Sequence, residues 1–246
     1  MRAGLRALGL ASVTGAECGA LWLETRLRGM SDERQDAYVR AWSGRLLAVF
    51  GVRVVDDPAL AALPAVPAAG RLIVSNHRSM LDILVILSRF GGNILSRDDL
   101  QRWPLFERLA AIAGTLYVDR GSSASGAASI RRVGDRLSRA RAVTVFAEGT
   151  TYPGDEVRPF HGGAFLAVAR TGGEVLPVGL AYHEPEAIYW QESLGAHGRR
   201  LIEQPSITVA LRLGARIPAA GQTTKRLTAE THAAVQAAVT RARGQL

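Results

Sequence analysis

The sequence predicts an α/β fold, in which a layered domain with a mixed central sheet flanked by helices follows an N-terminal two-helix segment. From residue 71 onward, short apolar segments alternate with segments of helical periodicity, a pattern typical of layered α/β domains. Hydrophobic residues make up 48% of the 246 residues, which is enough to form a full core. Residues 1–50 show two helical patterns and no strand, so we expect a boundary between residues 1–50 and 51–246.

The first helix is expected around the apolar run Ala7–Leu23, which Glu17 interrupts and arginines flank. The run is a poor transmembrane segment, because spanning a bilayer needs about 20 mostly apolar residues. It also lacks the small-x-small cleavage site that follows a secretory signal peptide. We therefore expect a membrane-associating helix that lies in the bilayer interface. The alternative is a helix that packs on the protein's own core.

The second helix is expected to begin after Ser31, a favourable N-cap that two acidic residues follow in the first turn. Gly51 is a favourable stop for this helix. Between these residues, apolar side chains recur at helical spacing and form one stripe. The stripe consists of Tyr38, Trp42, Leu46 and Val49.

The strands of the main domain are expected in short apolar or alternating segments between turn residues. They are Val52–Val55, Leu72–Val74, Asn93–Ser96, Thr115–Val118, Ala142–Phe146, Val175–Tyr182 and Ser206–Leu213. The helices are expected where apolar residues recur at spacings of three and four. They are Leu81–Phe90, Trp103–Ala113, Ala124–Arg139, Gly162–Arg170 and Thr223–Arg243. The segment Ala59–Gly70 is rich in proline and alanine and is expected to be a loop.

The charge composition favours an anionic partner. The net charge is +8, and nearly all of the positive charge is arginine, because Lys225 is the single lysine. Arginine suits bidentate contact with phosphate, so nucleic acid, an anionic bilayer or a phosphorylated substrate would each fit. The single cysteine excludes an intramolecular disulfide, and no Cys/His spacing is that of a zinc site.

An ionisable pair, His77 and Asp82, follows the predicted strand Leu72–Val74. Residues five apart do not share one face of a regular helix, but they meet if His77 lies in the loop and Asp82 in the first helical turn. Asp82 would then hold one imidazole nitrogen and leave the other free to take a proton from an alcohol. Taken alone, such a pair is more often a structural hydrogen bond than a catalytic one.

Two further polar clusters follow strands. The segment Phe146–Thr151 places Gly and Thr just past an apolar strand, where backbone N–H groups and hydroxyls can face an anion. Arg120 follows the strand Thr115–Val118. Each cluster by itself is also consistent with an ordinary turn or a solvated arginine.

Together, these clusters resemble the glycerolipid acyltransferase family, which includes the lysophosphatidic-acid acyltransferases. The HxxxxD box of that family corresponds to His77–Asp82, and its apolar strand ending in Asp-Arg corresponds to Leu116–Arg120. Its Glu-Gly-Thr block corresponds to Glu148–Thr150, and its strand with a central proline to Val175–Gly179. The order and spacing of the blocks fit the family over about residues 70–180.

The resemblance implies a role for each matching residue. His77 would deprotonate the acceptor hydroxyl and Asp82 would orient His77, so that the alkoxide attacks the acyl thioester without an acyl-enzyme. The thioester, acyl-CoA or acyl carrier protein, is a co-substrate, and neither a cofactor nor a metal is expected. The residues implied in acceptor binding are Arg97, Arg120, Glu148, Gly149 and Thr150. Of these, Arg120 would bind a phosphate, whereas Glu148 is expected to order its loop.

Two departures from the family pattern bear on the acceptor. Thr151 stands where the phosphatidic-acid enzymes usually carry Arg or Ser, and His161 stands at the position of a Lys. Both weaken a phosphate site, because charge-assisted hydrogen bonds are the stronger ones. We expect a lysolipid acceptor, first 1-acylglycerol-3-phosphate to give phosphatidic acid. The alternative is the phosphate-free lyso-ornithine lipid.

Other interpretations stay open. The same pair could activate water, which would make the protein a thioesterase. A basic membrane- or nucleic-acid-binding module would explain the charge, but it gives no reason for the order of His77, Asp82 and Glu148. We therefore expect an enzyme at the cytoplasmic face of the inner membrane, peripheral or monotopic, with no nucleic acid as partner.

Overall fold

The computed structural model describes residues 2–97, 114–118 and 123–246. Their strands form one mixed sheet of eight strands in the order β1-β7-β6-β2-β5-β3-β4, with β8 paired to β6, which confirms the α/β fold class. The strands are β1 (Val52–Val55), β2 (Arg71–Ser75), β3 (Asn93–Arg97), β4 (Leu116–Val118), β5 (Ala142–Phe146), β6 (Glu174–Tyr182), β7 (Ile207–Leu213) and β8 (Ile217–Pro218). The helices are α1 (Arg2–Arg28), α2 (Asp32–Phe50), α3 (Leu81–Phe90), α5 (Ser123–Leu137), α6 (Gly163–Thr171), α7 (Leu194–Glu203), α8 (Thr224–Arg243) and the short 3₁₀ helices η1 (Pro58–Ala62) and η3 (Pro185–Ala187).

Strand β2 lies in the middle of the parallel part of the sheet. It pairs in parallel with β5 and β6, so that Ser75 at its end lies opposite Phe146 and Val178. Strands β3 and β4 extend this parallel part, whereas β7 and β8 run antiparallel to β6. All residues of β2 are buried, as expected for a strand covered on both faces. The loops that follow β2 and β5 therefore leave the sheet side by side.

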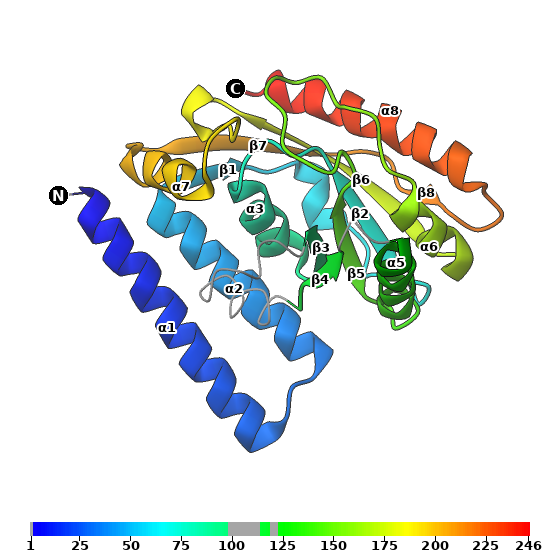
Figure 1. The fold of residues 1–246 in the computed structure, drawn as a ribbon, viewed down its shortest axis with the longest axis horizontal. Helices are drawn as coiled ribbons and strands as arrows, with labels where there is room; N and C mark the ends of the chain where they lie inside the picture. Colours follow the sequence, from blue (N-terminus) through cyan, green and yellow to red (C-terminus); the bar gives the residue numbers. More distant parts are fainter. Residues whose placement is uncertain (1, 98–113, 119–122) are drawn as a thin grey trace.

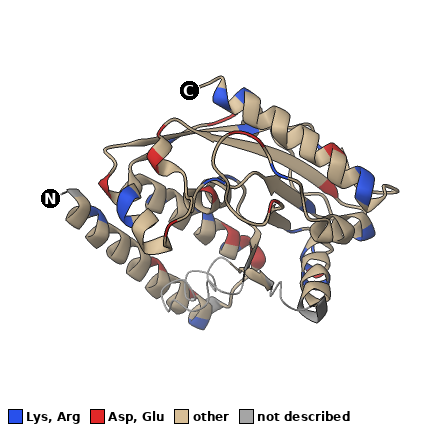
Figure 2. Cartoon of the chain, turned by 45° about the horizontal axis from the view of Figure 1, so that its top comes forward, with Lys and Arg blue, Asp and Glu red and all other residues tan. Residues whose placement is uncertain are grey.

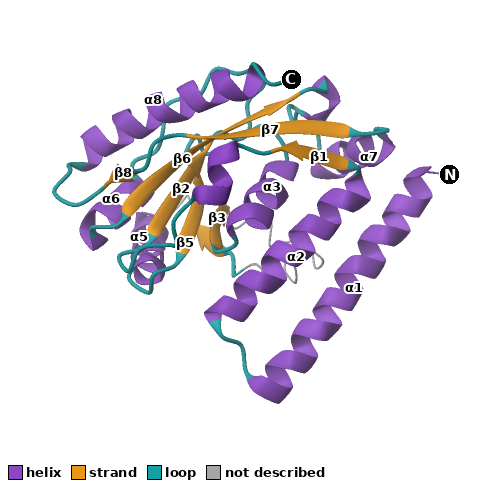
Figure 3. Ribbon diagram, turned by 180° about the vertical axis from the view of Figure 1, so that it is seen from behind, coloured by secondary structure: helices purple, strands orange, loops and turns teal. Residues whose placement is uncertain are grey.

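Helices cover both faces of the sheet (Figures 1 and 3). Along β2, Leu72 and Val74 pack with α5, α6 and α8, whereas Ile73 packs with α2 and α3, because successive strand side chains point to opposite faces. Gly179 in β6 lies against α8, and a Cβ at this position would lie 2.3 Å from the backbone carbonyl carbon of Ala238. The missing side chain lets α8 approach the sheet.

The two N-terminal helices lie side by side (Figure 1). As predicted, the side chain of Ser31 caps α2 by accepting a hydrogen bond from the N–H of Arg34, and Gly51 ends the helix in the left-handed conformation with φ 71°. The buried face of α2 joins the main core, and α1 packs on the same core through Leu10 and Val13. The domain boundary at residue 50 stays a prediction.

The side of α1 that faces away from the core carries large apolar residues. They are 52–72% exposed and comprise Leu5, Leu8, Trp22, Leu23 and Leu27. Glu17, which interrupts the apolar run, faces inward and pairs with Arg45 of α2. Within the described ranges, no helix is long and apolar enough to cross a membrane. One face of α1 thus packs on the protein while the other presents apolar side chains to the surroundings.

Helix α7, strand β8 and the 3₁₀ helices η1 and η3 were not among the expected elements. Helix α7 was not predicted, because two glycines interrupt its pattern and just His197 and Leu201 are buried. The expected loop Ala59–Gly70 overlaps η1, where the Asp57 carboxylate caps the N–H of Ala59. The helix expected at Trp103–Ala113 lies outside the described residues.

Candidate active site

Asn76 fixes the loop that follows β2. Its side-chain amide donates to the carbonyl of Leu180 at 2.9 Å, and its side-chain oxygen accepts from the N–H of Leu180 at 2.8 Å. These bonds continue the pairing of β2 with β6 beyond the last strand residue. Because Asn76 is fully buried, both bonds form away from water. The neighbouring residue, His77, therefore leaves the sheet edge in a defined direction.

His77 and Asp82 form the contact that the sequence spacing predicts. His77 lies in the loop and Asp82 in the first turn of α3, with Nδ1 of His77 2.8 Å from Oδ2 of Asp82. The imidazole is 18% exposed, whereas the carboxylate is fully buried. The His77 ring stacks on Phe146 with ring centroids 4.1 Å apart and an angle of 12° between the planes. Among the described residues, Nε2 of His77 has no hydrogen-bond partner.

Asp82 accepts hydrogen bonds at both carboxylate oxygens. Oδ2 also accepts the backbone N–H groups of Arg78 at 2.6 Å and Ser79 at 2.8 Å. Oδ1 accepts the hydroxyl of Tyr182 at 2.6 Å. Hydrogen bonds to the charged form of a carboxylate favour ionisation and oppose the cost of its burial. With both of its oxygens hydrogen-bonded, the Asp82 carboxylate is held in place beside Nδ1 of His77.

Glu148 and Arg78 join this loop to the loop that follows β5. Oε1 of Glu148 accepts the backbone N–H of His77 and Nη1 of Arg78, each at 2.8 Å. Oε2 accepts the N–H of Arg158 at 2.8 Å. The guanidinium of Arg78 also donates to the carbonyls of His77, Gly154 and Glu156. These contacts fit the loop-ordering role expected of Glu148.

Arg78 is a site residue that the sequence analysis did not single out. It is 2% exposed and forms its side-chain bonds with residues 70 or more positions away, apart from that to His77. The available signal was its place inside the His77–Asp82 box. A charged residue between an apolar strand and an apolar helix needs a buried partner or solvent, and the sequence does not say which.

Some of the remaining predicted binding residues lie next to Glu148, and others lie apart from it or outside the described residues. Gly149 and Thr150 follow Glu148, where Gly149 has φ 83° and Thr150 is exposed. Arg97 ends β3 opposite Val118 of β4, and the direction of its side chain lies outside the description. Arg120 lies outside the described residues. The structure therefore brings together His77, Asp82 and the Glu148–Thr150 block, and the roles of the two arginines stay predictions.

A buried polar cluster lies behind Asp82. His197 of α7 has a fully buried side chain, and its Nε2 lies 3.2 Å from Oγ of Ser79. Burial is the main cause that lowers the pKa of His197 to about 4. Burial is also the main cause that raises the pKa of Tyr182 well above its usual range, and the adjacent Asp82 charge raises it further. At neutral pH, both groups are therefore uncharged.

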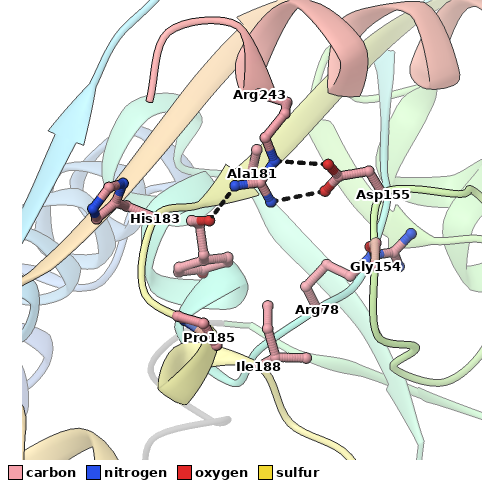
Figure 4. A pocket seen from close by; sticks show the side chains of 9 residues that line it. Arg78, Gly154, Asp155, Ala181, His183, Pro185, Ile188 and Arg243 are labelled. Carbon is pink, nitrogen blue, oxygen red and sulfur yellow. Dashed lines mark hydrogen bonds and ion pairs between the residues drawn. The ribbon is translucent and has the colours of Figure 1, made fainter.

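A small cavity of about 180 Å³ lies beside this cluster (Figure 4). Arg243 lines it and pairs with both carboxylate oxygens of Asp155, at 2.7 and 2.9 Å. The same guanidinium donates to the backbone carbonyl of Tyr182 at 2.6 Å. Arg243 thus ties the end of β6 to the C-terminal helix. Within the described part of the chain, no three His, Cys, Asp or Glu side chains are arranged to hold a metal ion.

Comparison with known proteins places this geometry in a family. Residues 60–181, which contain His77, Asp82 and the Glu148–Thr150 block, match the family described as Acyltransferase. A lyso-ornithine lipid O-acyltransferase from Pseudomonas aeruginosa is 32% identical over 95% of this chain and 91% of its own length. The chain belongs to the acyltransferase family. It is a lysolipid O-acyltransferase, and this membership favours the enzymatic interpretation over a binding module.

Two other relatives bear on the fold and the acceptor. A 1-acyl-sn-glycerol-3-phosphate acyltransferase from Neisseria gonorrhoeae is 29% identical over 47% of this chain and 45% of its own length. The crystal structure of the 1-acyl-sn-glycerophosphate acyltransferase PlsC from Thermotoga maritima superposes with a TM-score of 0.70. That match covers 98% of this chain and 96% of the other at 19% identity, so it supports the fold. The family therefore includes relatives named for two different acceptors.

Proposed function

We propose that this acyltransferase moves a fatty acyl group from acyl-CoA or acyl carrier protein to the hydroxyl of lyso-ornithine lipid. The observation that carries the acceptor is the match to the Pseudomonas aeruginosa protein, which extends over 95% of the chain. The Neisseria gonorrhoeae relative named for the phosphate-bearing acceptor matches over 47%. The alternative acceptor of the sequence analysis is thus favoured over 1-acylglycerol-3-phosphate, which becomes the second candidate.

The loop that follows Glu148 gives independent support for a phosphate-free acceptor. Thr151 is 7% exposed and offers a hydroxyl in place of a permanent positive charge. His161 is exposed and stands where a lysine would supply a compact, strongly hydrated positive charge. A phosphomonoester would gain less from these two residues than from an arginine and a lysine.

The proposed reaction begins with His77 as general base. Nε2 of His77 takes the proton of the acceptor hydroxyl while the hydroxyl oxygen attacks the carbonyl carbon of the thioester. The ionised Asp82, 2.8 Å from Nδ1, stabilises the imidazolium that forms. The carbon–sulfur bond then breaks, and the leaving thiolate takes the proton from Nε2. His77 returns to its neutral form without any covalent intermediate on the protein.

The environment of His77 supports this role. Stacking on Phe146 fixes the plane of the imidazole, and the backbone bond from His77 to Glu148 fixes its position. The ring is partly exposed, so that an acceptor can reach Nε2. A general base needs this combination of a held ring and one accessible nitrogen. The buried Arg78–Glu148 pair holds the loop that carries His77.

We place the enzyme at the cytoplasmic face of the inner membrane, with α1 as the membrane-associating helix. Its exposed apolar side chains would enter the bilayer interface, and Trp22 suits this depth because its amphipathic ring favours the headgroup level. Along α1, charges are sparse between the arginines at its ends (Figure 2). The positive net charge of the chain would add attraction to anionic lipids.

A donor–acceptor assay tests the proposal. Purified protein receives radiolabelled acyl-CoA or acyl carrier protein, with lyso-ornithine lipid and lysophosphatidic acid in separate reactions. We expect label in ornithine lipid, and we expect His77→Ala to lose about 10²–10⁴-fold in rate. The exposed residue His183 provides the matched control, and His183→Ala should keep the rate.

The other outcomes are equally informative. Label that enters phosphatidic acid alone would make lysophosphatidic acid the acceptor and leave the His77 mechanism standing. Thioester hydrolysis without any lipid product would favour the thioesterase. A His77→Ala variant that keeps the wild-type rate with lyso-ornithine lipid would disprove the general-base role.

A further inference from the structure

Asp82 is supported from the side opposite His77. Its Oδ1 accepts the hydroxyl of Tyr182 at 2.6 Å, and both residues are buried. An ionised carboxylate can accept but cannot donate, so the hydroxyl proton of Tyr182 lies on the bond to Asp82. The oxygen of Tyr182 is therefore left as an acceptor for another group.

Ser79 is a polar neighbour of this hydroxyl and acts against the burial that raises the pKa of Tyr182. The oxygen of Ser79 accepts the N–H of Leu81 at 3.3 Å and lies 3.2 Å from Nε2 of His197. His197, Ser79 and Tyr182 thus form a buried polar cluster beside Asp82.

The position of Tyr182 is itself well fixed. It ends β6, where its backbone pairs with Val209 of β7. Its carbonyl accepts a hydrogen bond from Arg243, which Asp155 holds through both carboxylate oxygens. The side chain is 2% exposed and packs in the main core. A hydroxyl held in this way can fix the orientation of a neighbouring carboxylate.

We propose that Tyr182 is a positioning residue of the acyl-transfer site, whose hydroxyl holds Asp82 ionised with Oδ2 facing Nδ1 of His77. Ser79 lies beside this hydroxyl, and His197 lies beside Ser79. This inference rests on the proposed function, because it assigns a task to Tyr182 in the reaction that His77 would begin.

The physical need for this support comes from the complete burial of Asp82. Burial disfavours an ionised carboxylate, and each donated hydrogen bond favours it. Without the Tyr182 hydroxyl, Oδ1 would lose the one donor that the structure gives it among the described residues. The His77–Asp82 pair would then bind a proton more tightly. Because His77 must be neutral to act as base, activity would begin at a higher pH.

The other charged groups near this pair offset one another. Arg78 and Glu148 face the pair from the two loops and form an ion pair with each other. On the α7 side, Arg200 pairs with Glu192, which lies 3.1 Å from Nδ1 of His197. Burial keeps His197 uncharged near neutral pH. A shift of the titration midpoint on removal of the Tyr182 hydroxyl would therefore report the His77–Asp82 pair.

The test compares the wild type with Tyr182→Phe, which removes one oxygen and keeps the ring. NMR of histidine-labelled protein follows the titration of His77 without any substrate, with the signal assigned by His77→Gln. The pH profile of kcat/KM then follows the same titration during turnover. Tyr38→Phe is the matched control, because it removes a hydroxyl that donates to Glu24 between α1 and α2.

We expect the His77 midpoint in Tyr182→Phe to rise by about one pH unit in both measurements. We also expect kcat to fall about 10- to 100-fold, with the KM for the thioester unchanged, since a hydrogen bond to a charged group is lost. Tyr38→Phe should keep the wild-type midpoint. An unchanged midpoint in Tyr182→Phe, with or without a loss of activity, would overturn the proposal.

Two provisions keep the test decisive. If the wild type acylates none of the lysolipids, the proposed function fails, while the NMR titration still decides whether Tyr182 controls the His77–Asp82 pair. If Tyr182→Phe does not fold, Ser79→Ala takes its place, because it removes the polar neighbour of the Tyr182 hydroxyl. Ser79→Ala should raise the midpoint in the same direction, and an unchanged midpoint would then overturn the proposal.

Discussion

Arg78 and Glu148 are 70 residues apart in the sequence and form a 2.8 Å ion pair with both side chains buried. The pair joins the loop after β2 to the loop after β5, and the same Glu148 oxygen accepts the backbone N–H of His77. The position of His77 therefore depends on a charge pair that bonds to its backbone. Such a pair makes both stability and activity sensitive to one carboxylate.

Replacement of Glu148 by Ala should cost about 3–5 kcal/mol of unfolding free energy, because it leaves the buried Arg78 charge without its partner. Urea denaturation measures this loss. Glu156→Ala is the control, since Glu156 pairs with Arg158 at 3.3 Å while 73% exposed, and such a pair contributes about 1 kcal/mol or less. Equal losses in the two variants would contradict the prediction.

The hydrogen bond between His77 and Asp82 can be tested by removing the charge of Asp82. In Asp82→Asn, an amide nitrogen that faces Nδ1 would donate to it and move the imidazole proton to Nε2, the nitrogen that must act as base. We expect kcat to fall by about 10²–10⁴-fold while the fold is kept. Circular dichroism and the acyl-transfer assay check both statements. Asp135→Asn, on the exposed face of α5, is the control and should retain full activity. An Asp82→Asn variant as active as the wild type would refute the proposed role of the His77–Asp82 pair.

The His77–Asp82 contact could be predicted because it is local. A loop residue and a residue in the first turn of the next helix are close in the chain, so they can meet without knowledge of which strands pair. The partners of Arg78 and the hydroxyl of Tyr182 could not be predicted, because their contacts depend on which strands pair. Tyr182 reaches Asp82 across 100 residues only when β6 lies next to β2.

The fold itself was predicted well where hydrophobic patterns are strong. The second N-terminal helix begins and ends at its predicted caps, Ser31 and Gly51, and the strand Ala142–Phe146 has the predicted bounds. Helix α7 was missed because its amphipathic pattern is short and contains glycines. Its buried face includes His197, so the cluster behind Asp82 could not be predicted from the hydrophobic pattern.

Membrane binding should depend on the exposed apolar face of α1. Trp22→Ser combined with Leu23→Ser should weaken binding to anionic liposomes about 10-fold or more, because two large side chains would no longer be buried in the interface. Liposome sedimentation measures the change. Trp190 is 42% exposed on another part of the surface, so Trp190→Ser is the control and should bind as the wild type does. Undiminished binding of the α1 variant would show that another surface associates with the membrane.

The packing of α8 on the sheet should be sensitive to a single methyl group. In Gly179→Ala, the new Cβ would lie 2.3 Å from backbone atoms of Ala238 and Val239, so the helix must move away. We expect a loss of about 1–3 kcal/mol in unfolding free energy, measured by urea denaturation. Gly195 in α7 has open space at its Cβ position, and Gly195→Ala should be neutral or stabilising. A Gly179→Ala protein as stable as Gly195→Ala would contradict this account of the close approach.

The buried His197 should make the protein acid-sensitive. Burial lowers its pKa from the ordinary 6.5 to about 4, so between these pH values the unfolded chain binds a proton that the folded chain does not. Stability should therefore decrease as the pH falls from 6.5 through about 4, by about 3 kcal/mol from this group, and the loss should level off below the folded-state pKa. Urea denaturation across this range should give a flatter stability curve for His197→Gln than for the wild type. The exposed His183 serves as control, and His183→Gln should follow the wild-type curve. Parallel curves for His197→Gln and the wild type would mean that His197 titrates alike in the folded and unfolded chains.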